Sequence, residues 1–370
     1  MTRPEAERLR FIYHDVTWPH DHPASGPVAN IVYAAWQRSL LAPVKVEHRR
    51  VGFDVAHHLT FGSWRQPSQL WRLGIPFVFG PVGGGEEAPR RLLATLPPRS
   101  RLSEHLRNSW NAVALRNPAV RRALQAARMV PAKTRETADW VERAGVRAPV
   151  SLEIGIEPPA DPVPTIRAVD APLQCLFVGR LVEWKGVRLA IDAVALARRN
   201  GVDVRLTIVG TGALEAELRA AVTAYGFKET IIFTGAMPQA QVFARYRSHD
   251  LLLFPSLHDS SGNVVLEALA FGLPVVCLAL GGPGEMVDAS CGIAIECGSI
   301  DRETTVAALA DGLASLAQNE RRRRSMAAGA IARAGEMTWD AAVTRVYAPL
   351  EADLAARNQV VEPYTQSQAH

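Results

Sequence analysis

Short apolar runs alternate with segments of helical apolar spacing along residues 170–300. The apolar runs predict buried strands, at 173–179, 204–209, 230–235, 251–254 and 273–278. Between them, apolar residues recur every three or four positions, which predicts helices at 187–199, 214–224 and 239–246. This alternation indicates an α/β domain with a parallel sheet covered by helices on both faces. Ligands of such sheets bind at the carboxyl ends of the strands, so the loops after the strands are the candidate binding segments.

The loop after the strand at 251–254 carries two acids. Asp259 and Glu267 lie eight positions apart in the sequence DSSGNVVLE. We expect a helix to begin in this loop, because it offers three good N-cap residues, Ser260, Ser261 and Asn263. The free N–H groups of a helix N-terminus suit a phosphate, and the oxygens of Glu267 suit sugar hydroxyls, so the combination indicates a nucleotide-linked sugar. The simpler alternative is a helix-capping Asp and a surface Glu.

The loop after the strand at 173–179 carries two cations. In the sequence GRLVEWKG, Gly179 is followed by Arg180 and then by Lys185. Arg offers a planar fork of donors and Lys a point charge, a pair that can neutralise a diphosphate. An ordinary basic loop is the alternative interpretation, and the presence of both motifs in order along one sheet argues against it.

These two segments resemble the motifs of retaining glycosyltransferases of family 4, which have the GT-B fold of two Rossmann-like domains facing a cleft. The resemblance implies that Arg180 and Lys185 hold the donor diphosphate. It also implies that Glu267 holds the donor through its ribose and that Asp259 contacts the donor sugar. Most members have Glu where this chain has Asp259, so the carboxylate here reaches one methylene less far. These four residues are the expected catalytic set.

The resemblance implies further donor contacts. A Gly-x-Gly turn after the strand at 204–209 places Gly210 beside the donor, although such turns are common in βα units. The turn after 230–235 lies near the base in the family, which implicates Met237, for which core packing is the alternative. The helix N-terminus expected to stabilise the leaving phosphate comprises Gly262, Asn263 and Val264.

The first part of the chain is expected to supply the acceptor side. Strands are predicted at 9–13, 53–57 and 75–79. Glycines after the last of these permit close approach to a ligand, and two histidines near the end of the second can contact acceptor or sugar. The acceptor-side candidates are therefore His57, His58, Gly83 and Gly84. The alternatives are a structural hydrogen-bonding role for the histidines and a flexible connection for the glycines.

Residues 51–86 resemble a bacterial subgroup of family 4 that makes envelope or exported polysaccharides. The strand predicted at 9–13 looks like the family's third strand. At about 30 residues per βαβ unit, roughly 50 to 60 residues would then be missing and the N-terminal domain would be incomplete. We expect the resulting open sheet edge to lower solubility or activity.

A proline-rich stretch, with Pro158, Pro159, Pro162 and Pro164, is typical of a domain boundary. We expect an N-terminal domain at 1–152 and a nucleotide-sugar-binding domain at 165–339. An amphipathic helix at 340–357 is expected to return and pack on the first domain, as in other GT-B enzymes.

Composition and charge are consistent with this organisation. With 370 residues, 48% of them hydrophobic, the chain can bury the cores of two domains. Its four cysteines lie in or beside apolar runs without metal-ligand spacing, which indicates a reduced cytosolic protein. Residues 1–150 are basic and hold most of the tryptophans, whereas the remainder is acidic. That half suits an anionic membrane surface. An arginine-rich solvated surface is an equal alternative, and no nucleic-acid motif is present.

We therefore expect sugar transfer, with retention, from a nucleoside-diphosphate sugar to a glycan or lipid-linked acceptor. No metal or other cofactor is expected, because the two cations and the helix N-terminus neutralise the leaving diphosphate. The expected location is cytoplasmic, with peripheral contact at the inner face of the cell membrane left open. Two alternatives remain: a nucleotide-sugar epimerase, which needs no acceptor, and a non-catalytic protein that only binds a nucleotide sugar.

Overall fold

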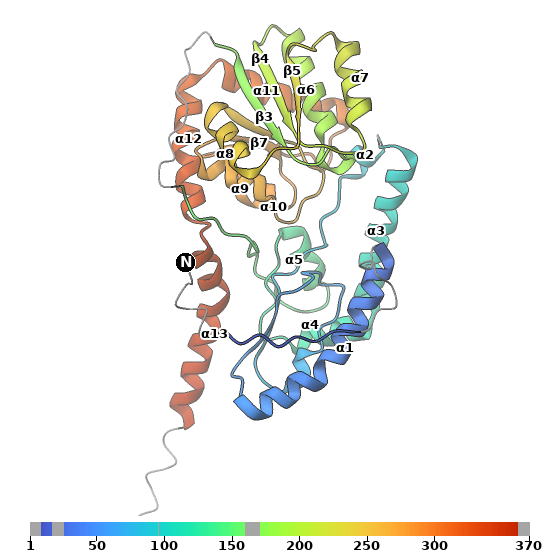
Figure 1. The fold of residues 1–370 in the computed structure, drawn as a ribbon, viewed down its shortest axis with the longest axis vertical. Coiled ribbons are helices and arrows are strands. Elements are labelled where there is room, and N and C mark those ends of the chain that lie inside the picture. The colour runs from blue at the N-terminus through green and yellow to red at the C-terminus, as the bar shows by residue number, and fades with distance from the viewer. Residues whose placement is uncertain (1–8, 17–25, 95, 160–170, 362–370) are drawn as a thin grey trace, which may run out of the picture.

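The computed structural model describes residues 9–16, 26–94, 96–159 and 171–361, and Figure 1 shows two domains, one above the other. The second domain contains a sheet in the order β5-β4-β3-β6-β7-β8. Every strand pair described in this sheet is parallel. Its strands are β3 (Leu173–Val178), β4 (Val204–Val209), β5 (Ile231–Gly235), β6 (Leu251–Phe254), β7 (Val275–Leu278) and β8 (Gly292–Ile295).

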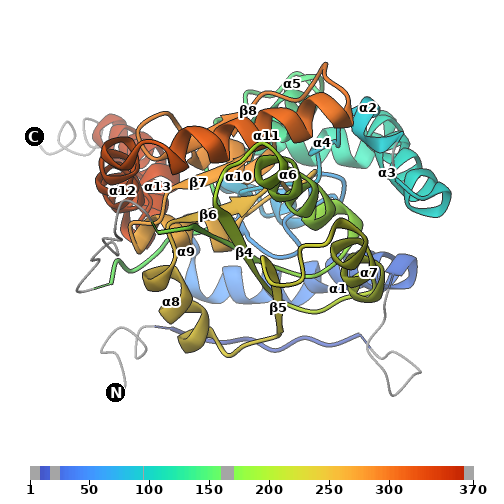
Figure 2. The same ribbon diagram turned by 90° about the horizontal axis from the view of Figure 1, so that it is seen from above.

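Helices cover both faces of this sheet. Figure 2 shows α6 (Val187–Arg199) and α7 (Glu215–Tyr225) on one face, with α8 (Gln239–Ser248) and α9 (Asn263–Ala270) on the other. Because both faces are covered, β6 and β7 are buried along their whole length. The remaining segments of the domain are η3 (Glu183–Lys185), α10 (Gly281–Met286), α11 (Arg302–Ala317) and α12 (Glu320–Gly335).

The sequence pattern predicted most of this domain. The strands expected from apolar runs and the helices expected from spacing are confirmed, with ends that differ by one or two residues. The strand at 273–278 begins later, at Val275, after Pro274, which has no N–H to donate to the sheet. Strand β8 was not predicted, because four residues that include a glycine give too short an apolar signal.

The N-terminal domain has little regular sheet. Strands β1 (Ala56–His58) and β2 (Phe77–Phe79) pair in parallel, and single bridges such as Val82 to Ala132 extend the pairing. Its core is built around Trp64, Phe77 and Phe79. The helices are α1 (Gly26–Val51), α2 (Arg90–Leu93), α3 (Pro98–Arg116), α4 (Pro118–Ala126) and α5 (Arg135–Glu142), with a 3-10 turn η2 (Leu70–Leu73).

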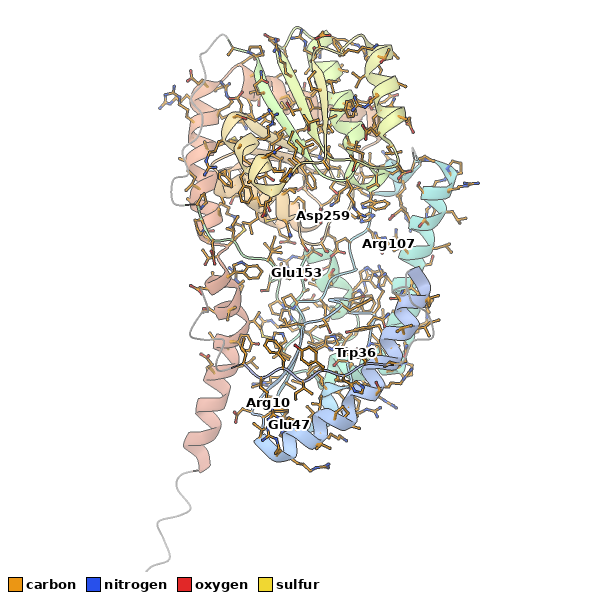
Figure 3. The ribbon with its side chains drawn as sticks, in the orientation of Figure 1. Arg10, Trp36, Glu47, Arg107, Glu153 and Asp259 are labelled. Carbon is orange, nitrogen blue, oxygen red and sulfur yellow. The ribbon has the colours of Figure 1, made fainter. Side chains whose placement is uncertain are left out.

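The prediction of a strand at 9–13 is wrong. Residues 9–16 form neither helix nor strand, and the apolar side chains of this run are exposed: Leu9, Phe11, Ile12 and Tyr13. The segment is held against α1 instead. Trp36 Nε1 donates to the His14 carbonyl at 2.8 Å, and Arg10 pairs with Glu47 at 2.7 Å (Figure 3). An apolar run forms a strand only where the edge of a neighbouring strand can pair with its backbone N–H and C=O groups. Here the neighbour is the helix α1, which contacts the segment through side chains.

The C-terminal helix α13 (Trp339–Val361) returns to the N-terminal domain. Figure 1 shows it running on from α12 and descending beside the first domain. Val346 and Leu350 pack on Val78 of β2 in a small hydrophobic cluster. The predicted start of the second domain, residue 165, lies outside the described residues. In the part of the chain that the structure describes, no helix has both the length and the apolar character needed to cross a membrane.

Candidate active site

A cavity of about 270 Å³ lies at the carboxyl ends of β3 and β6. Its lining includes the residues that both sequence motifs singled out: Gly179, Lys185, Asp259, Gly262, Asn263 and Val264. The motifs are about 80 residues apart in sequence, and adjacent strands of a parallel sheet bring them together.

Two glycines make this convergence possible. Gly186 has φ 68°, and a Cβ at this position would lie 1.8 Å from the carbonyl oxygen of Pro255. Only glycine lets the loop after β3 approach the loop after β6 so closely. Gly262, with φ 66°, is the N-cap of α9 and turns the chain into the helix without a side-chain cap. The Trp184 carbonyl fastens the two loops, accepting from Leu257 N at 2.8 Å and from Ser256 Oγ at 3.0 Å.

Asp259 has three partners at the cavity, one for one carboxylate oxygen and two for the other. One carboxylate oxygen forms an ion pair with Lys185 Nζ. The other accepts from the backbone N–H of Ser261 at 3.3 Å and of Gly262 at 3.1 Å. The N-cap of α9 is Gly262, in place of the serines and Asn263 that the sequence suggested, and Asp259 holds the loop just before the helix. The carboxylate thus holds both the loop and the cation.

Glu267 lies on α9 and is held by two donors. The Tyr246 hydroxyl donates to one carboxylate oxygen at 2.9 Å, and Gln239 Nε2 donates to the other at 3.4 Å. Tyr246 is fully buried, and burial followed by the nearby Glu267 charge raises its pKa well above the usual value, so it stays protonated. Neither donor was predicted. A polar hydroxyl on the inner face of α8 was the only sequence signal.

The other donor-side candidates, Arg180, Gly210 and Met237, are not among the residues that line the cavity. Arg180 is exposed, and its guanidinium lies 5.6 Å from the centre of the Trp184 ring. Gly210, with φ 136°, packs so tightly on Gly179 that a Cβ would lie 1.9 Å from its carbonyl oxygen. Met237 is partly buried against the hydrophobic core of the second domain. The structure thus brings Lys185 into the cavity with Asp259, and leaves Arg180 in solvent beside Trp184.

The glycine loop of the N-terminal domain, which contains Gly83 and Gly84, faces the loop between β6 and α9. A Cβ on Gly83 would lie 3.4 Å from the Cβ of Ser260, and a Cβ on Gly84 would lie 2.7 Å from Arg65 Nη2. Beside them, Lys133 forms an ion pair with Glu153, and Ser261 Oγ donates to the same Glu153 carboxylate. Figure 3 shows Glu153 and Asp259 together at the junction of the domains.

Lys133 and Glu153 are junction residues that the sequence reasoning missed. Lys133 is 7% exposed and follows the buried residues Val130 and Ala132. A lysine directly after an apolar run was the available signal, but its partner Glu153 is distant in sequence. Glu86 is also buried here and accepts from Gly84 N at 3.0 Å.

The two candidate histidines have partners away from the cavity loops. His57 contacts the Tyr347 hydroxyl of α13 and the Gly80 carbonyl. His58 Nε2 lies 2.9 Å from the Tyr33 hydroxyl and 2.8 Å from the Thr60 carbonyl. Burial is the main cause that lowers the pKa of both rings, which favours the neutral form at physiological pH.

The second domain is similar to known glycosyltransferases. Residues 166–333 match the family model described as glycosyl transferases group 1. A 106-residue stretch is 38% identical to 2-deoxystreptamine glucosyltransferase of Streptomyces kanamyceticus, covering 29% of this chain and 27% of that protein. A 141-residue stretch is 33% identical to the amylovoran biosynthesis glycosyltransferase AmsK of Erwinia amylovora, covering 36% of this chain and 35% of that protein. The chain therefore matches well under half the length of these relatives.

Both domains together are similar in fold to a solved two-domain structure. HepE of Anabaena, in complex with UDP, superposes with a TM-score of 0.57 at 20% identity, covering 86% of this chain and 82% of that chain. At this identity the likeness concerns the fold alone. The match extends over both the domain with the cavity and the domain with the glycine loop. The chain therefore has the α/β fold of GT-B glycosyltransferases that its sequence predicted.

Proposed function

We propose that the protein is a retaining glycosyltransferase of family 4 that uses a nucleoside-diphosphate sugar as donor. The observation that carries the proposal is the cavity of about 270 Å³ in which Lys185, Asp259 and the N-terminus of α9 converge. The match of residues 166–333 to group 1 glycosyltransferases supports it. Gly83, opposite Ser260, supports an acceptor side in the N-terminal domain.

The donor diphosphate binds where positive charge is concentrated. The first backbone N–H groups of α9 have no partner within the helix and carry the positive end of its dipole. Lys185 adds a full charge on the same cavity wall. Arg180 turns from its place beside Trp184 to add a second. These groups neutralise the leaving diphosphate, so the proposed reaction needs no metal.

In the transfer step, the bond between the anomeric carbon and the diphosphate oxygen breaks, and a bond to the acceptor oxygen forms on the same face of the sugar. The acceptor hydroxyl gives its proton to the departing phosphate oxygen. Glu267, fixed by Tyr246 and Gln239, holds the ribose of the donor. When the diphosphate binds Lys185, it replaces Asp259 as the partner of that lysine. Asp259 is then free to contact the sugar hydroxyls.

Similarity to two known proteins supports a choice of donor base and of acceptor class. HepE of Anabaena binds UDP, which favours a UDP-sugar here. AmsK of Erwinia amylovora is named for amylovoran biosynthesis, which favours a glycan or lipid-linked acceptor in polysaccharide biosynthesis. We place the reaction in the cytoplasm, at the inner face of the cell membrane.

The test is sugar transfer from a panel of UDP-, GDP- and ADP-sugars to lipid-linked and soluble glycan acceptors. NMR of the product should show the anomeric configuration of the donor, and EDTA should leave the rate unchanged. Inversion would contradict the retaining mechanism, and loss of activity with EDTA would contradict the metal-free one. A donor sugar converted without acceptor would indicate an epimerase. Nucleotide binding without any turnover would indicate a non-catalytic protein.

A further inference from the structure

Helix α3 presents an apolar stripe to solvent. Leu102, Leu106, Trp110 and Val113 recur every three or four residues, so they share one face of this 19-residue helix. Each is between 51% and 63% exposed. In Figures 1 and 2, α3 lies at the outer edge of the molecule. A single exposed apolar residue needs no explanation, but a continuous row marks an interaction surface.

The opposite face of α3 is polar and points into the protein. Glu104 and Asn111 are buried, and Arg107 donates to the Glu86 carbonyl. Glu104 also lies 3.0 Å from His258 of the second domain, and Asn111 Nδ2 donates to Glu87 at 3.3 Å. A surface helix normally buries its apolar face and exposes its polar one. The reversed arrangement means that folding of the chain leaves the apolar stripe without a partner from the described residues.

The exposed side of α3 is also basic. Arg99, Arg101 and Arg116 are exposed, whereas the single acidic residue of the helix, Glu104, faces inward. An apolar row flanked by arginines complements a surface with an apolar interior and anionic head groups. A second copy of this chain would bring the same cations face to face, which disfavours self-association.

We propose that α3 docks its outer face on an anionic lipid bilayer, with Leu106 and Trp110 entering the head-group region and the arginines binding acidic lipids. The inner face of the same helix contacts Glu86 and Glu87, and also His258 of the second domain. Docking of α3 would therefore hold the cleft between the two domains close to the membrane. This inference rests on the proposed function in one respect: the acceptor that reaches the cleft from this side is lipid-linked.

The test is co-sedimentation of the full chain with phosphatidylcholine vesicles, with and without phosphatidylglycerol, at low and high salt. The parent chain should bind only the anionic vesicles, and less at high salt. Leu106→Ser with Trp110→Ser should weaken binding at least about tenfold, because two large apolar side chains lose their burial. Arg99→Gln should weaken it about fivefold, since each nearby cation contributes on the order of 1 kcal/mol.

Matched controls change similar residues elsewhere. Val343→Ser on α13 and Arg205→Gln on β4 replace exposed residues outside α3, and both should bind like the parent. Equal binding by the α3 variants and the controls would overturn the proposal, as would no binding by the parent. A dimer that dissociates on Trp110→Ser would also overturn it in favour of a second copy. Nucleotide-induced thermal stabilisation should be unchanged in every α3 variant, so failure of docking is distinguishable from failure of the donor site.

Discussion

At the scale of single residues, the cavity depends on Asp259 binding both the loop before α9 and Lys185. Its carboxylate accepts the N–H groups of Ser261 and Gly262 and pairs with Lys185. It therefore maintains the loop geometry before donor binds and competes with the diphosphate for the lysine. These two effects can be separated by substitution.

Asp259→Asn should bind the nucleoside diphosphate several-fold more tightly than the parent chain at low salt. The amide oxygen still accepts the two N–H groups of the loop, but Lys185 no longer pairs with a carboxylate charge. Sugar transfer should be slower, because a contact to the donor sugar is weakened. Titration calorimetry with the nucleotide checks the first effect.

Asp259→Ala provides the contrast, because it also removes the acceptor of the Ser261 and Gly262 N–H groups. We expect the free energy of unfolding to fall by about 1 kcal/mol, a usual net contribution of a hydrogen bond. Equal stability of the Asn and Ala variants, together with unchanged nucleotide affinity in both, would contradict the dual role.

Tyr246→Phe tests whether the buried hydroxyl positions Glu267. Loss of the 2.9 Å hydrogen bond frees the carboxylate to rotate. The KM for the donor should therefore rise about tenfold or more, since a bond to a charged group is worth about 1.5–3 kcal/mol. The matched control is Tyr225→Phe, which removes a 2.7 Å bond to Asp192 in the same domain. A KM that rises equally in both variants would point to a general loss of packing.

At the scale of elements, apolar periodicity predicted the second domain because its central strands, β3, β6 and β7, are buried on both faces. β6 and β7 are continuous apolar runs bounded by turn residues, which few other structures produce. In the N-terminal domain, β1 and β2 are three residues each, shorter than the window in which alternation is visible. The apolar run at 9–13 was predicted to be a strand from its composition alone, but among the described residues it has no neighbouring strand to pair with.

The approach of the two cavity loops should depend on glycine at position 186. Gly186→Ala places a methyl group 1.8 Å from the Pro255 carbonyl oxygen and must also adopt φ 68°. Gly226→Ala meets the same backbone strain at φ 76° but has open space around the added Cβ. Gly226→Ala should cost about 1 kcal/mol of stability, and Gly186→Ala clearly more. Urea unfolding of both variants measures the difference, and equal losses would show that the loops can separate freely.

At the scale of the whole molecule, the two domains meet through charged and polar contacts that no sequence pattern predicted. Glu136 accepts from Gly281 N at 2.8 Å, and Glu285 accepts from Arg135 N at 2.6 Å. Such pairs join residues about 150 positions apart, and neither partner has a local signature. The sequence could therefore predict the two loops that meet at the cavity, but not which residues of the N-terminal domain complete the junction.

The Glu104–His258 contact should make stability depend on pH. Burial alone would raise the pKa of Glu104, but the hydrogen bond and charge of His258, with Arg107, lower it below 4.5. A depressed carboxyl pKa stabilises the fold above the unfolded-state value, and this stabilisation is lost as pH falls through the folded-state value. The stability difference between the parent and Glu104→Gln should thus be present at about pH 7 and shrink below about pH 4.

Thermal unfolding across this pH range checks the prediction. Glu215→Gln is the control, because Glu215 pairs with Arg219 within one exposed helix turn and does not join the domains. A difference for Glu104→Gln that stays constant with pH would contradict the role of the ionised Glu104 carboxylate.

The most direct test of the donor site is thermal stabilisation by UDP, GDP, ADP and TDP. A nucleotide at about 100 times its dissociation constant adds about 2.7 kcal/mol to the stability of a chain that binds it. We expect one nucleotide, UDP, to stabilise the parent and the exposed-lysine control Lys228→Ala, but not Lys185→Ala. Stabilisation of Lys185→Ala to the same extent as the parent, or no stabilisation by any nucleotide, would contradict a diphosphate site in this cavity.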